Sequence, residues 1–367
     1  MKKYRVGVIG FAHMHVRSLV ADFHNLGEKI EWIACSDLEP LIPSKSDKLS
    51  TRDHNLKSVM ERTGMTKVYN DYTKLLDESN LDIAIVCCEN AFHGQVVSDI
   101  LSRGINVVVE KPMATTMRDA LLMVDAAKRS GAALAVNWPS TWFPAIRLAH
   151  KLTSEGAIGK IFKFIYRNND SQGPFSHGES LTEEEMASQW WYHSKVGGGA
   201  FWDYCCYGSC LASWFIGSPV RSAFGIRANF NSPFGSAEDN GAITAKFDDA
   251  IALIEGSWTT VNPGVPHGPV IFGLEGTLVT DGNEVRLYDK RRTSTPTKVY
   301  KADPLPEDRN NIAKEFMSHL EKGTPLHPTL DIETNLNAMM ILDAGYRSSI
   351  SGKMEQSAGH HYTIYDL

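Results

Sequence analysis

The chain has 367 residues, which exceeds one ordinary hydrophobic core and favours two domains. Its hydrophobic fraction of 43% and charged fraction of 22% are typical of a globular protein. The formal net charge is −6 and no basic run occurs, which argues against nucleic acid as a partner. No apolar stretch approaches the ~20 residues of a membrane span, and the N-terminus lacks the features of a signal peptide. We therefore expect a cytoplasmic protein with no membrane partner.

Cysteine and histidine spacing indicates neither a disulfide framework nor a metal site. There is no Cys-x-x-Cys pair and no helix with the His-Glu-x-x-His pattern. We expect buried free thiols and no bound metal. The six cysteines are Cys35, Cys87, Cys88, Cys205, Cys206 and Cys210.

The first part of the chain alternates short apolar runs with amphipathic stretches. Strands are predicted at residues 4–9, 30–35, 67–69, 81–88, 105–110 and 132–137, with helices between them. This alternation is typical of a doubly wound parallel sheet. We assign residues 1–138 to a dinucleotide-binding Rossmann domain.

After residue 138 the pattern changes to strands that follow one another without helices. A helix at 142–154 and a strand at 161–167 come first, and three glycines precede a helix at 200–216. Strands are then predicted at 219–230, 241–248, 250–259, 268–273, 277–281 and 284–289, followed by helices at 308–322 and 331–350. Residues 139–367 are thus expected to form an α+β domain with a large, mostly antiparallel open sheet. One face would be covered by helices and the other by a second subunit, and the C-terminal helix is free to pack back on the Rossmann domain.

The first strand leads into Gly10-Phe11-Ala12-His13-Met14-His15 and then into a helix. The free N–H groups at a helix N-terminus suit a pyrophosphate. The Gly-x-Gly-x-x-Gly fingerprint is only partly kept, because Ala12 takes the second position and His15 the third. This motif alone is weak evidence for a dinucleotide.

The second strand ends at Asp37, close to the spacing of the acidic residue that binds ribose hydroxyls in Rossmann domains. A carboxylate there favours NAD over NADP, since it repels a 2′-phosphate. The alternative is a loop aspartate that caps the next turn.

The run from Ile105 to Val109 reads as a strand buried on both faces, ending in Glu110, Lys111 and Pro112. Ligands of open α/β sheets bind at the carboxyl ends of the strands, so this ionisable pair is a candidate site. The alternative is that Lys111 is a solvated lysine at a strand end.

Taken together, these motifs resemble the glucose–fructose oxidoreductase, inositol dehydrogenase and rhizopine-catabolism (Gfo/Idh/MocA) family over nearly the whole chain. In chain order they are the glycine turn at 7–15, Asp37, Glu89-Asn90-Ala91-Phe92-His93, Glu110-Lys111-Pro112, Asn137, Gly156-Ala157-Ile158-Gly159, Gly197-Gly198-Gly199, Asp203 with Tyr207, Glu238-Asp239 and the turn at 273–276. The most specific combination is Glu-Lys-Pro after the fifth strand with the later triple glycine.

The resemblance implies hydride exchange between a nicotinamide cofactor and a hydroxyl-bearing carbon of a sugar, inositol or related polyol. It also implies NAD as cofactor with NADP as the alternative, a homodimer or homotetramer formed through the C-terminal sheet, and a cis Lys111–Pro112 bond. The cofactor-binding residues that it implies are Gly10, Phe11, Ala12, His13, Met14, Asp37, Cys88, Glu89, Asn90, His93, Glu110, Lys111, Pro112 and Asn137.

The resemblance places the chemistry on Lys111, Tyr207 and Asp203. Tyr207 stands where the commonest family pattern has a histidine, as in the tyrosine-type branch, and Cys210 replaces its second aspartate. A free phenol is a poor base at neutral pH, so we expect a nearby Lys111 ammonium to lower its pKa. Asp203 would orient Tyr207 or pair with Lys111. The alternative for Tyr207 is a buried core aromatic.

Five further residues are candidates for a polyol pocket, because aromatic faces suit the C–H side of a sugar and polar groups suit its hydroxyls. They are Trp138, Arg167, Asn168, Trp191 and His193. Packing in the core or at an interface is the alternative for each. The competing function is a non-catalytic nucleotide or sugar sensor, for which the altered phosphate loop is the best support.

Overall fold

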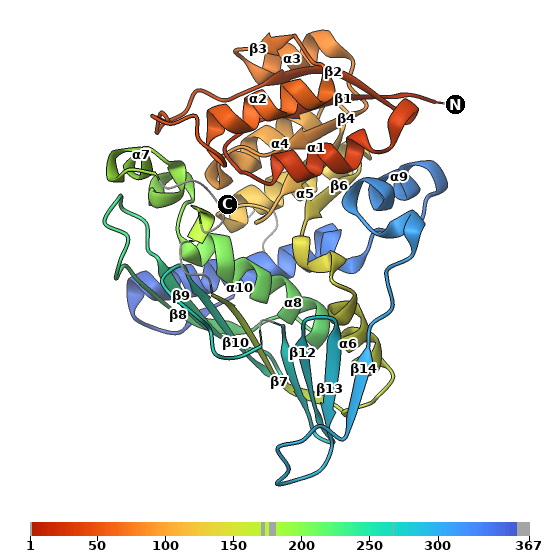
Figure 1. The fold of residues 1–367 in the computed structure, drawn as a ribbon, viewed down its shortest axis with the longest axis vertical. Helices are drawn as coiled ribbons and strands as arrows, with labels where there is room; N and C mark the ends of the chain where they lie inside the picture. Colours follow the sequence, from red (N-terminus) through yellow and green to blue (C-terminus); the bar gives the residue numbers. More distant parts are fainter. Residues whose placement is uncertain (1, 170–172, 176–180, 267, 358–367) are drawn as a thin grey trace.

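The structure is a computed structural model that describes residues 2–169, 173–175, 181–266 and 268–357. Two sheets form it, one above the other in Figure 1, with helices between them. No helix among the described residues has the length and apolar character needed to cross a membrane.

The first sheet has six parallel strands in the order β3-β2-β1-β4-β5-β6. They are β1 (Tyr4–Ile9), β2 (Ile30–Ser36), β3 (Val68–Tyr69), β4 (Ile83–Val86), β5 (Asn106–Glu110) and β6 (Leu134–Asn137). The order reverses between β1 and β4, which creates the crevice where ligands of such sheets bind. The predicted doubly wound sheet is confirmed.

Five helices connect these strands and cover the sheet (Figure 1). They are α1 (Val16–His24), α2 (Arg52–Thr63), α3 (Tyr72–Ser79), α4 (His93–Leu101) and α5 (Met117–Ser130). Local chemistry sets their ends: Thr116 accepts the N–H of Asp119 at the start of α5, and Gly131, with φ of 72°, ends it.

The second sheet has nine strands in the order β14-β13-β12-β11-β7-β10-β9-β8-β15. All neighbours are antiparallel except β7 and β10, which confirms the mostly antiparallel prediction. The strands are β7 (Ile161–Asn169), β8 (Ser222–Ala228), β9 (Asn240–Lys246), β10 (Ile251–Ser257), β11 (Val270–Gly273), β12 (Thr277–Asp281), β13 (Glu284–Tyr288), β14 (Lys298–Lys301) and β15 (Glu355–Gln356). The sequence analysis missed β14 and the two-residue β15 and made β8 too long.

One face of this sheet is covered by helices and the other is open. The helices of this half are α6 (Pro144–Ser154), α7 (Glu183–Ala187), α8 (Cys206–Ile216), α9 (Ile312–Lys322) and α10 (Ile332–Ser351). Helix α10 contacts β8 and β9, and Gly225 permits this because a Cβ there would lie 2.1 Å from the carbonyl oxygen of Gly345. On the open face Ile226 and Phe230 are 58% and 77% exposed.

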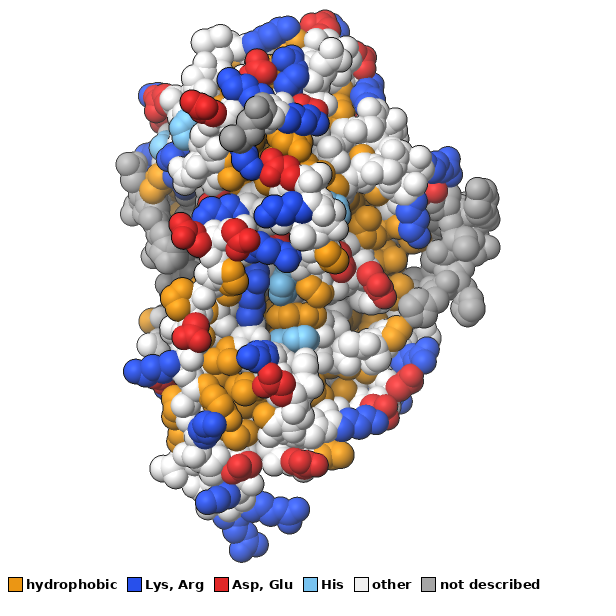
Figure 2. Space-filling view, turned by 90° about the vertical axis from the view of Figure 1, so that its right-hand side faces the viewer, with side chains coloured by type: hydrophobic (Ala, Val, Ile, Leu, Met, Phe, Trp, Pro, Cys, Tyr) orange, Lys and Arg blue, Asp and Glu red, His pale blue; other side chains and the backbone are white. Residues whose placement is uncertain are grey.

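The C-terminal helices also contact the first domain. Helix α10 packs on α5 and α9 packs on α1, so both C-terminal helices contact the Rossmann domain, whereas β15 after them pairs with β8 of the second sheet (Figure 1). Figure 2 shows the face that lies on the right in Figure 1. Charged side chains of both signs are spread over it, and hydrophobic side chains gather in its lower half.

Candidate functional site

A cavity of about 290 Å³ opens at the carboxyl end of β5, between the two domains. We name it the Lys111 cavity. This volume lies near the lower end of the range of about 300–1,000 Å³ for small-molecule sites. It is lined by His13, Met14, His15, Lys111, Pro139, Ser140, Phe143, Tyr166, Asn168, Gly173, Pro174, Trp191, Asp203, Tyr204 and Tyr207.

Lys111 is buried and paired with Asp203. Its Nζ lies 2.5 Å from Asp203 Oδ1 and donates to the Asp203 carbonyl oxygen at 3.0 Å. That carbonyl lies in a π-helical turn, η7 (Phe201–Cys205), which precedes α8; such turns occur frequently at functional sites. Burial alone would lower the pKa of Lys111, but the Asp203 carboxylate raises it above its ordinary value. Lys111 therefore stays an ammonium, and the solvated-lysine alternative does not apply.

The expected activation of Tyr207 by Lys111 is wrong. Lys111 Nζ lies over the face of the ring, 5.0 Å from its centroid. Burial, followed by the nearby Glu110 and Cys206, raises the pKa of Tyr207 well above its ordinary value. The phenol thus keeps its proton, and as part of the cavity wall it has a hydrogen to donate.

The glycine turn after β1 holds the backbone close to β4. Gly10 has φ of 85°, and a Cβ there would lie 2.4 Å from the backbone nitrogen of Cys88, so only glycine fits. Ala12 is buried, and its carbonyl accepts the indole N–H of Trp190 at 2.8 Å. A segment of the second domain therefore lies against the phosphate loop.

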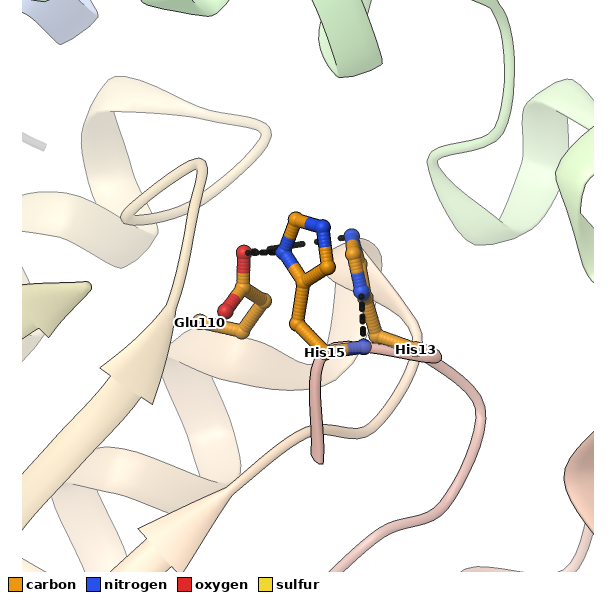
Figure 3. Close-up of side chains that lie close together, drawn as sticks. All are labelled: His13, His15 and Glu110. Carbon is orange, nitrogen blue, oxygen red and sulfur yellow. Dashed lines mark hydrogen bonds and ion pairs between the residues drawn. The ribbon is translucent and has the colours of Figure 1, made fainter. Parts of the chain in front are cut away.

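The two histidines of this loop meet the carboxylate at the end of β5 (Figure 3). His15 Nδ1 lies 2.8 Å from Glu110 Oε1, and His13 Nε2 lies 3.9 Å from the same oxygen. His13 Nδ1 accepts the backbone N–H of His15 at 3.1 Å. The second oxygen of Glu110 accepts the amide of Asn137 at 2.9 Å, so both oxygens of the buried carboxylate have protein partners.

Two imidazoles and one carboxylate are also a donor set found in metal sites, and these three groups lie within 4.8 Å of one another. Their hydrogen bonds do not suit an ion. Burial, followed by His15 and Lys111, lowers the pKa of His13 well below its ordinary value, so the ring is neutral. Since Nδ1 accepts a hydrogen bond, Nε2 carries the proton and offers no lone pair.

The carboxylate after β2 has a cation beside it that the sequence analysis missed. Arg52 of α2 lies 2.6 Å from Asp37 Oδ1 and also pairs with the buried Glu89. Asp37 Oδ1 further accepts the backbone N–H groups of Phe11 and Leu38. Asp37 therefore belongs to a buried ionic network and is more than a loop cap.

A second cavity, of about 340 Å³, lies beside Asp37, and we name it the Asp37 cavity. Three carboxylates and no cation line it, together with apolar and aromatic side chains. Its residues are Asp37, Leu38, Glu39, Leu41, Asn70, Asp71, Tyr72 and Phe92. This lining, with the close approach at Gly10 and the N-terminus of α1, fits an adenosine group and the phosphates that follow it.

Several predicted cofactor residues make hydrogen bonds to the backbone of the loops around the site. His93 is buried, and its Nδ1 lies 2.9 Å from the carbonyl oxygen of Pro112. Asn90 donates to the Gly197 carbonyl at 2.8 Å, which ties the β4 turn to the triple glycine. Cys88 is fully buried. The Lys111–Pro112 peptide bond is cis, as predicted.

Three of the five predicted substrate residues lie outside the Lys111 cavity lining. Trp138 is buried in the core, where its indole N–H donates to Asn335 Oδ1 at 2.7 Å. Arg167 pairs with Glu255 on β10 at 3.1 Å. His193 Nε2 lies 2.8 Å from the Ala187 carbonyl oxygen. Each thus has a protein partner, and Trp138 also packs edge-on behind the cavity residue Tyr207.

Asn168 and Trp191 do line the cavity, and so do four groups that the sequence analysis did not propose for substrate. These are His15, Ser140, Tyr166 and Tyr204. His15 carried a usable signal, since a large polar residue had replaced the last glycine of the fingerprint. Tyr166 and Tyr204 carried none, because aromatic residues on a strand or in an apolar helix usually pack in a core.

The sequence and the fold both match proteins that are already known. Residues 4–138 match the "Oxidoreductase family, NAD-binding Rossmann fold", and residues 146–279 match the "GFO/IDH/MocA C-terminal domain". A levoglucosan dehydrogenase of Pseudarthrobacter phenanthrenivorans is 23% identical over 69% of this chain and 67% of its own length. A myo-inositol 2-dehydrogenase of Thermotoga maritima is 22% identical over 84% and 90%.

Solved structures share the fold over almost the whole chain. The WlbA dehydrogenase of Bordetella pertussis, in complex with NADH and UDP-GlcNAcA, has a TM-score of 0.74 at 20% identity, with 97% and 99% of the two chains covered. A levoglucosan dehydrogenase in complex with NADH and levoglucosan has a TM-score of 0.74 at 16% identity, with 97% and 100% covered. With both domains matched in order, the chain belongs to the Gfo/Idh/MocA family of NAD-binding oxidoreductases.

Proposed function

We propose that the protein transfers a hydride between NAD and a hydroxyl-bearing carbon of a sugar, inositol or related polyol. The observation that carries this proposal is the buried Lys111–Asp203 pair beside Tyr207 in the wall of the Lys111 cavity. The relatives named as sugar and inositol dehydrogenases support the same class of substrate.

The cavity lining suits a polyol. Trp191, Tyr166 and Tyr204 present aromatic surface for the C–H side of a ring, while Asn168 and Ser140 offer hydrogen bonds to hydroxyls. At the β5 end, the Lys111 ammonium and the Tyr207 phenol are both donors. We assign them to the oxygen of the reacting carbon, where they stabilise the negative charge that develops in either direction of the reaction.

NAD, when bound, supplies the hydride acceptor or donor. The residues that would hold it are those of the glycine turn and the Asp37 cavity: Gly10 permits the close backbone approach, and α1 offers free N–H groups. Asp37 would bind the ribose hydroxyls, and the acidic lining favours NAD over NADP. Lys111 and Tyr207 would fix the substrate oxygen near the β5 end.

We also propose a homo-oligomer built through the open face of the second sheet, and a cytoplasmic location. The exposed Ile226 and Phe230 on that face support burial against a second copy. All six cysteines are free and buried, which is typical of a reducing compartment.

The test is a cofactor titration followed by a substrate screen. Fluorescence quenching with NADH would measure cofactor binding, and absorbance at 340 nm would follow turnover on monosaccharides, inositols and anhydrosugars. We expect binding of NADH and turnover of at least one polyol. NADH binding without turnover on any of them would favour the sensor, and an absence of NADH binding would overturn the proposal.

A further inference from the structure

Oxidation of an alcohol needs a group that accepts the hydroxyl proton, and the two expected residues cannot do so. Lys111 keeps its proton because Asp203 lies 2.5 Å from its Nζ. Tyr207 keeps its proton because burial raises the pKa of its phenol. Both are donors, and the two oxygens of Asp203 already accept from Lys111 and from the indole N–H of Trp258, so the candidates for the proton acceptor are the other groups of the Lys111 cavity.

His15 has the geometry of such a group. Its Nδ1 lies 2.8 Å from the Oε1 atom of Glu110, a fully buried carboxylate that only accepts hydrogen bonds when ionised. In the neutral ring Nδ1 therefore carries the proton, and Nε2 keeps a lone pair. Within the part of the chain that the structure describes, His15 Nε2 has no hydrogen-bond partner. The side chain is 28% exposed and lines the cavity, and Nε2 is the ring nitrogen that is turned away from Glu110 (Figure 3).

We propose that His15, held in this orientation by Glu110, is the general base that removes the hydroxyl proton from the substrate. The proposal rests on the proposed function. As the hydride leaves the carbon for NAD, the O–H bond breaks, its electron pair forms the carbonyl, and the proton goes to His15 Nε2. The partly exposed ring then returns this proton to water, and reduction runs in the opposite sense. Lys111 and Tyr207 donate hydrogen bonds to the same oxygen.

Glu110 is suited to hold His15 in this orientation because its carboxylate stays ionised. Burial alone would raise the pKa of Glu110, but His15, Lys111 and the amide of Asn137 lower it overall. A buried carboxylate on Nδ1 fixes the tautomer of an imidazole and stabilises its protonated form. The arrangement joins β5 to the start of α1.

The charged and titratable groups around His15 come from four parts of the chain: its own loop, the end of β5, η7 and α8. His13 lies in the same loop, with ring centroids 4.3 Å apart, and Glu110 and Lys111 end β5. Asp203 and Tyr207 come from η7 and α8 across the cavity. His13 is a positioning residue: its neutral ring accepts the His15 N–H and packs on Trp191, with centroids 4.7 Å apart.

The test combines His15→Gln and His15→Gly with a matched control. His24→Gln changes an exposed histidine at the last residue of α1, the helix that follows His15, and is expected to leave kcat unchanged. Loss of a positioned base typically costs about 10²–10⁴-fold, so we expect a fall of this size in kcat for His15→Gln. The dissociation constant for NADH should change far less. Added imidazole should restore part of the turnover of His15→Gly, which a purely structural role would not allow.

A second readout needs no turnover. Long-range ¹H–¹⁵N spectra of histidine-labelled protein, assigned by the signals absent from His15→Gln, should show His15 protonated at Nδ1 and unprotonated at Nε2 when neutral. Near-normal kcat of His15→Gln, or the opposite tautomer, would overturn the inference. So would a stoichiometric zinc or manganese ion whose removal abolishes activity. If the wild type turns over no polyol with NAD, the proposed function fails instead, and the spectra still test the His15–Glu110 pair.

Discussion

Lys111 contacts Tyr207 through the face of the phenol ring, with Nζ 5.0 Å from the ring centroid, while Asp203 holds the same ammonium at 2.5 Å. The lysine–tyrosine pair was expected both to accept the hydroxyl proton and to donate hydrogen bonds to the substrate oxygen. This arrangement leaves it only the second task. Asp203 holds Lys111 as an ammonium, and burial keeps the proton on the Tyr207 phenol. Both groups therefore remain hydrogen-bond donors, and proton acceptance passes to another group.

Tyr207→Phe should slow catalysis without moving the pH profile near neutrality. The change removes one donor to the substrate oxygen and keeps the ring that packs edge-on against Trp138. Loss of one such donor costs about 10²–10³-fold in kcat. Because the phenol pKa is raised, it does not titrate near pH 7. Near-normal kcat on the true substrate would show that Tyr207 only packs.

Lys111→Met should impair both stability and turnover. It leaves the Asp203 carboxylate buried without its cation, and breaking such a pair costs about 3–5 kcal/mol. Urea unfolding would measure this, and adding Asp203→Asn should recover part of the stability but none of the activity. Because Lys111 and Tyr207 serve the same oxygen, Lys111→Met with Tyr207→Phe should be little worse than the more damaged single variant. Full additivity of the two losses in kcat would contradict the shared role.

The first sheet and the position of Lys111 could be predicted because local patterns determine them. The β-branched run before Glu110 admits few structures other than a buried strand, and the carboxyl end of that strand is where α/β sheets bind ligands. The two-residue β15 was missed because no local pattern determines it: Glu355 and Gln356 form a strand only by pairing with β8.

The side-chain partners could not be predicted, because the partners lie far apart in the sequence. Trp138 follows a strand end and looked like a pocket residue, but its ring turns into the core toward Asn335. Arg52 lies in a polar helix with no motif of its own, and only the fold brings it to Asp37 and Glu89. The π-helical turn at Phe201–Cys205 likewise depends on tertiary contacts, and it decides which atoms Lys111 meets.

Asp22→Asn should stabilise the protein above pH 6. Burial raises the pKa of Asp22 to about 6, although Lys314 of α9 partly opposes this. Between the unfolded value and pH 6 the native state binds more protons than the unfolded state, so this group lowers stability as the pH rises through that window. An amide there removes the cost, on the order of 1 kcal/mol for a partly exposed group. Thermal unfolding at pH 4 and pH 8 would check it: the gain should appear at pH 8 and disappear at pH 4.

Ala12→Gly should tighten NADH binding. Ala12 takes the second glycine position of the fingerprint, where the backbone approaches the pyrophosphate, and its methyl group limits that approach. The helix N-terminus and Gly10 remain, so the wild type should still bind NADH, but less tightly. A fluorescence titration of the two proteins measures the difference. Equal or weaker binding by Ala12→Gly would show that the loop has adjusted to the methyl group.

The wild-type protein should bind NADH more tightly than NADPH. The Asp37 cavity has three carboxylates and no cation in its lining, and the nearby Arg52 is already shared between Asp37 and Glu89, so a 2′-phosphate would meet net negative charge. Side-by-side titrations at one salt concentration would measure this. Tighter binding of NADPH would contradict the assignment of Asp37 to the ribose.

Asp37→Ser should shift this preference toward NADPH, because it exposes a cation that the carboxylate now occupies. Arg52 lies 2.6 Å from Asp37 Oδ1, and its second partner, Glu89, would still hold the guanidinium in place. Arginine suits phosphate through paired hydrogen bonds, so the freed N–H groups can bind the 2′-phosphate. Adding Arg52→Gln to Asp37→Ser is the matched control and should remove the gain in NADPH affinity. If the gain survives in the double variant, relief of repulsion alone explains it and Arg52 has no part in cofactor choice.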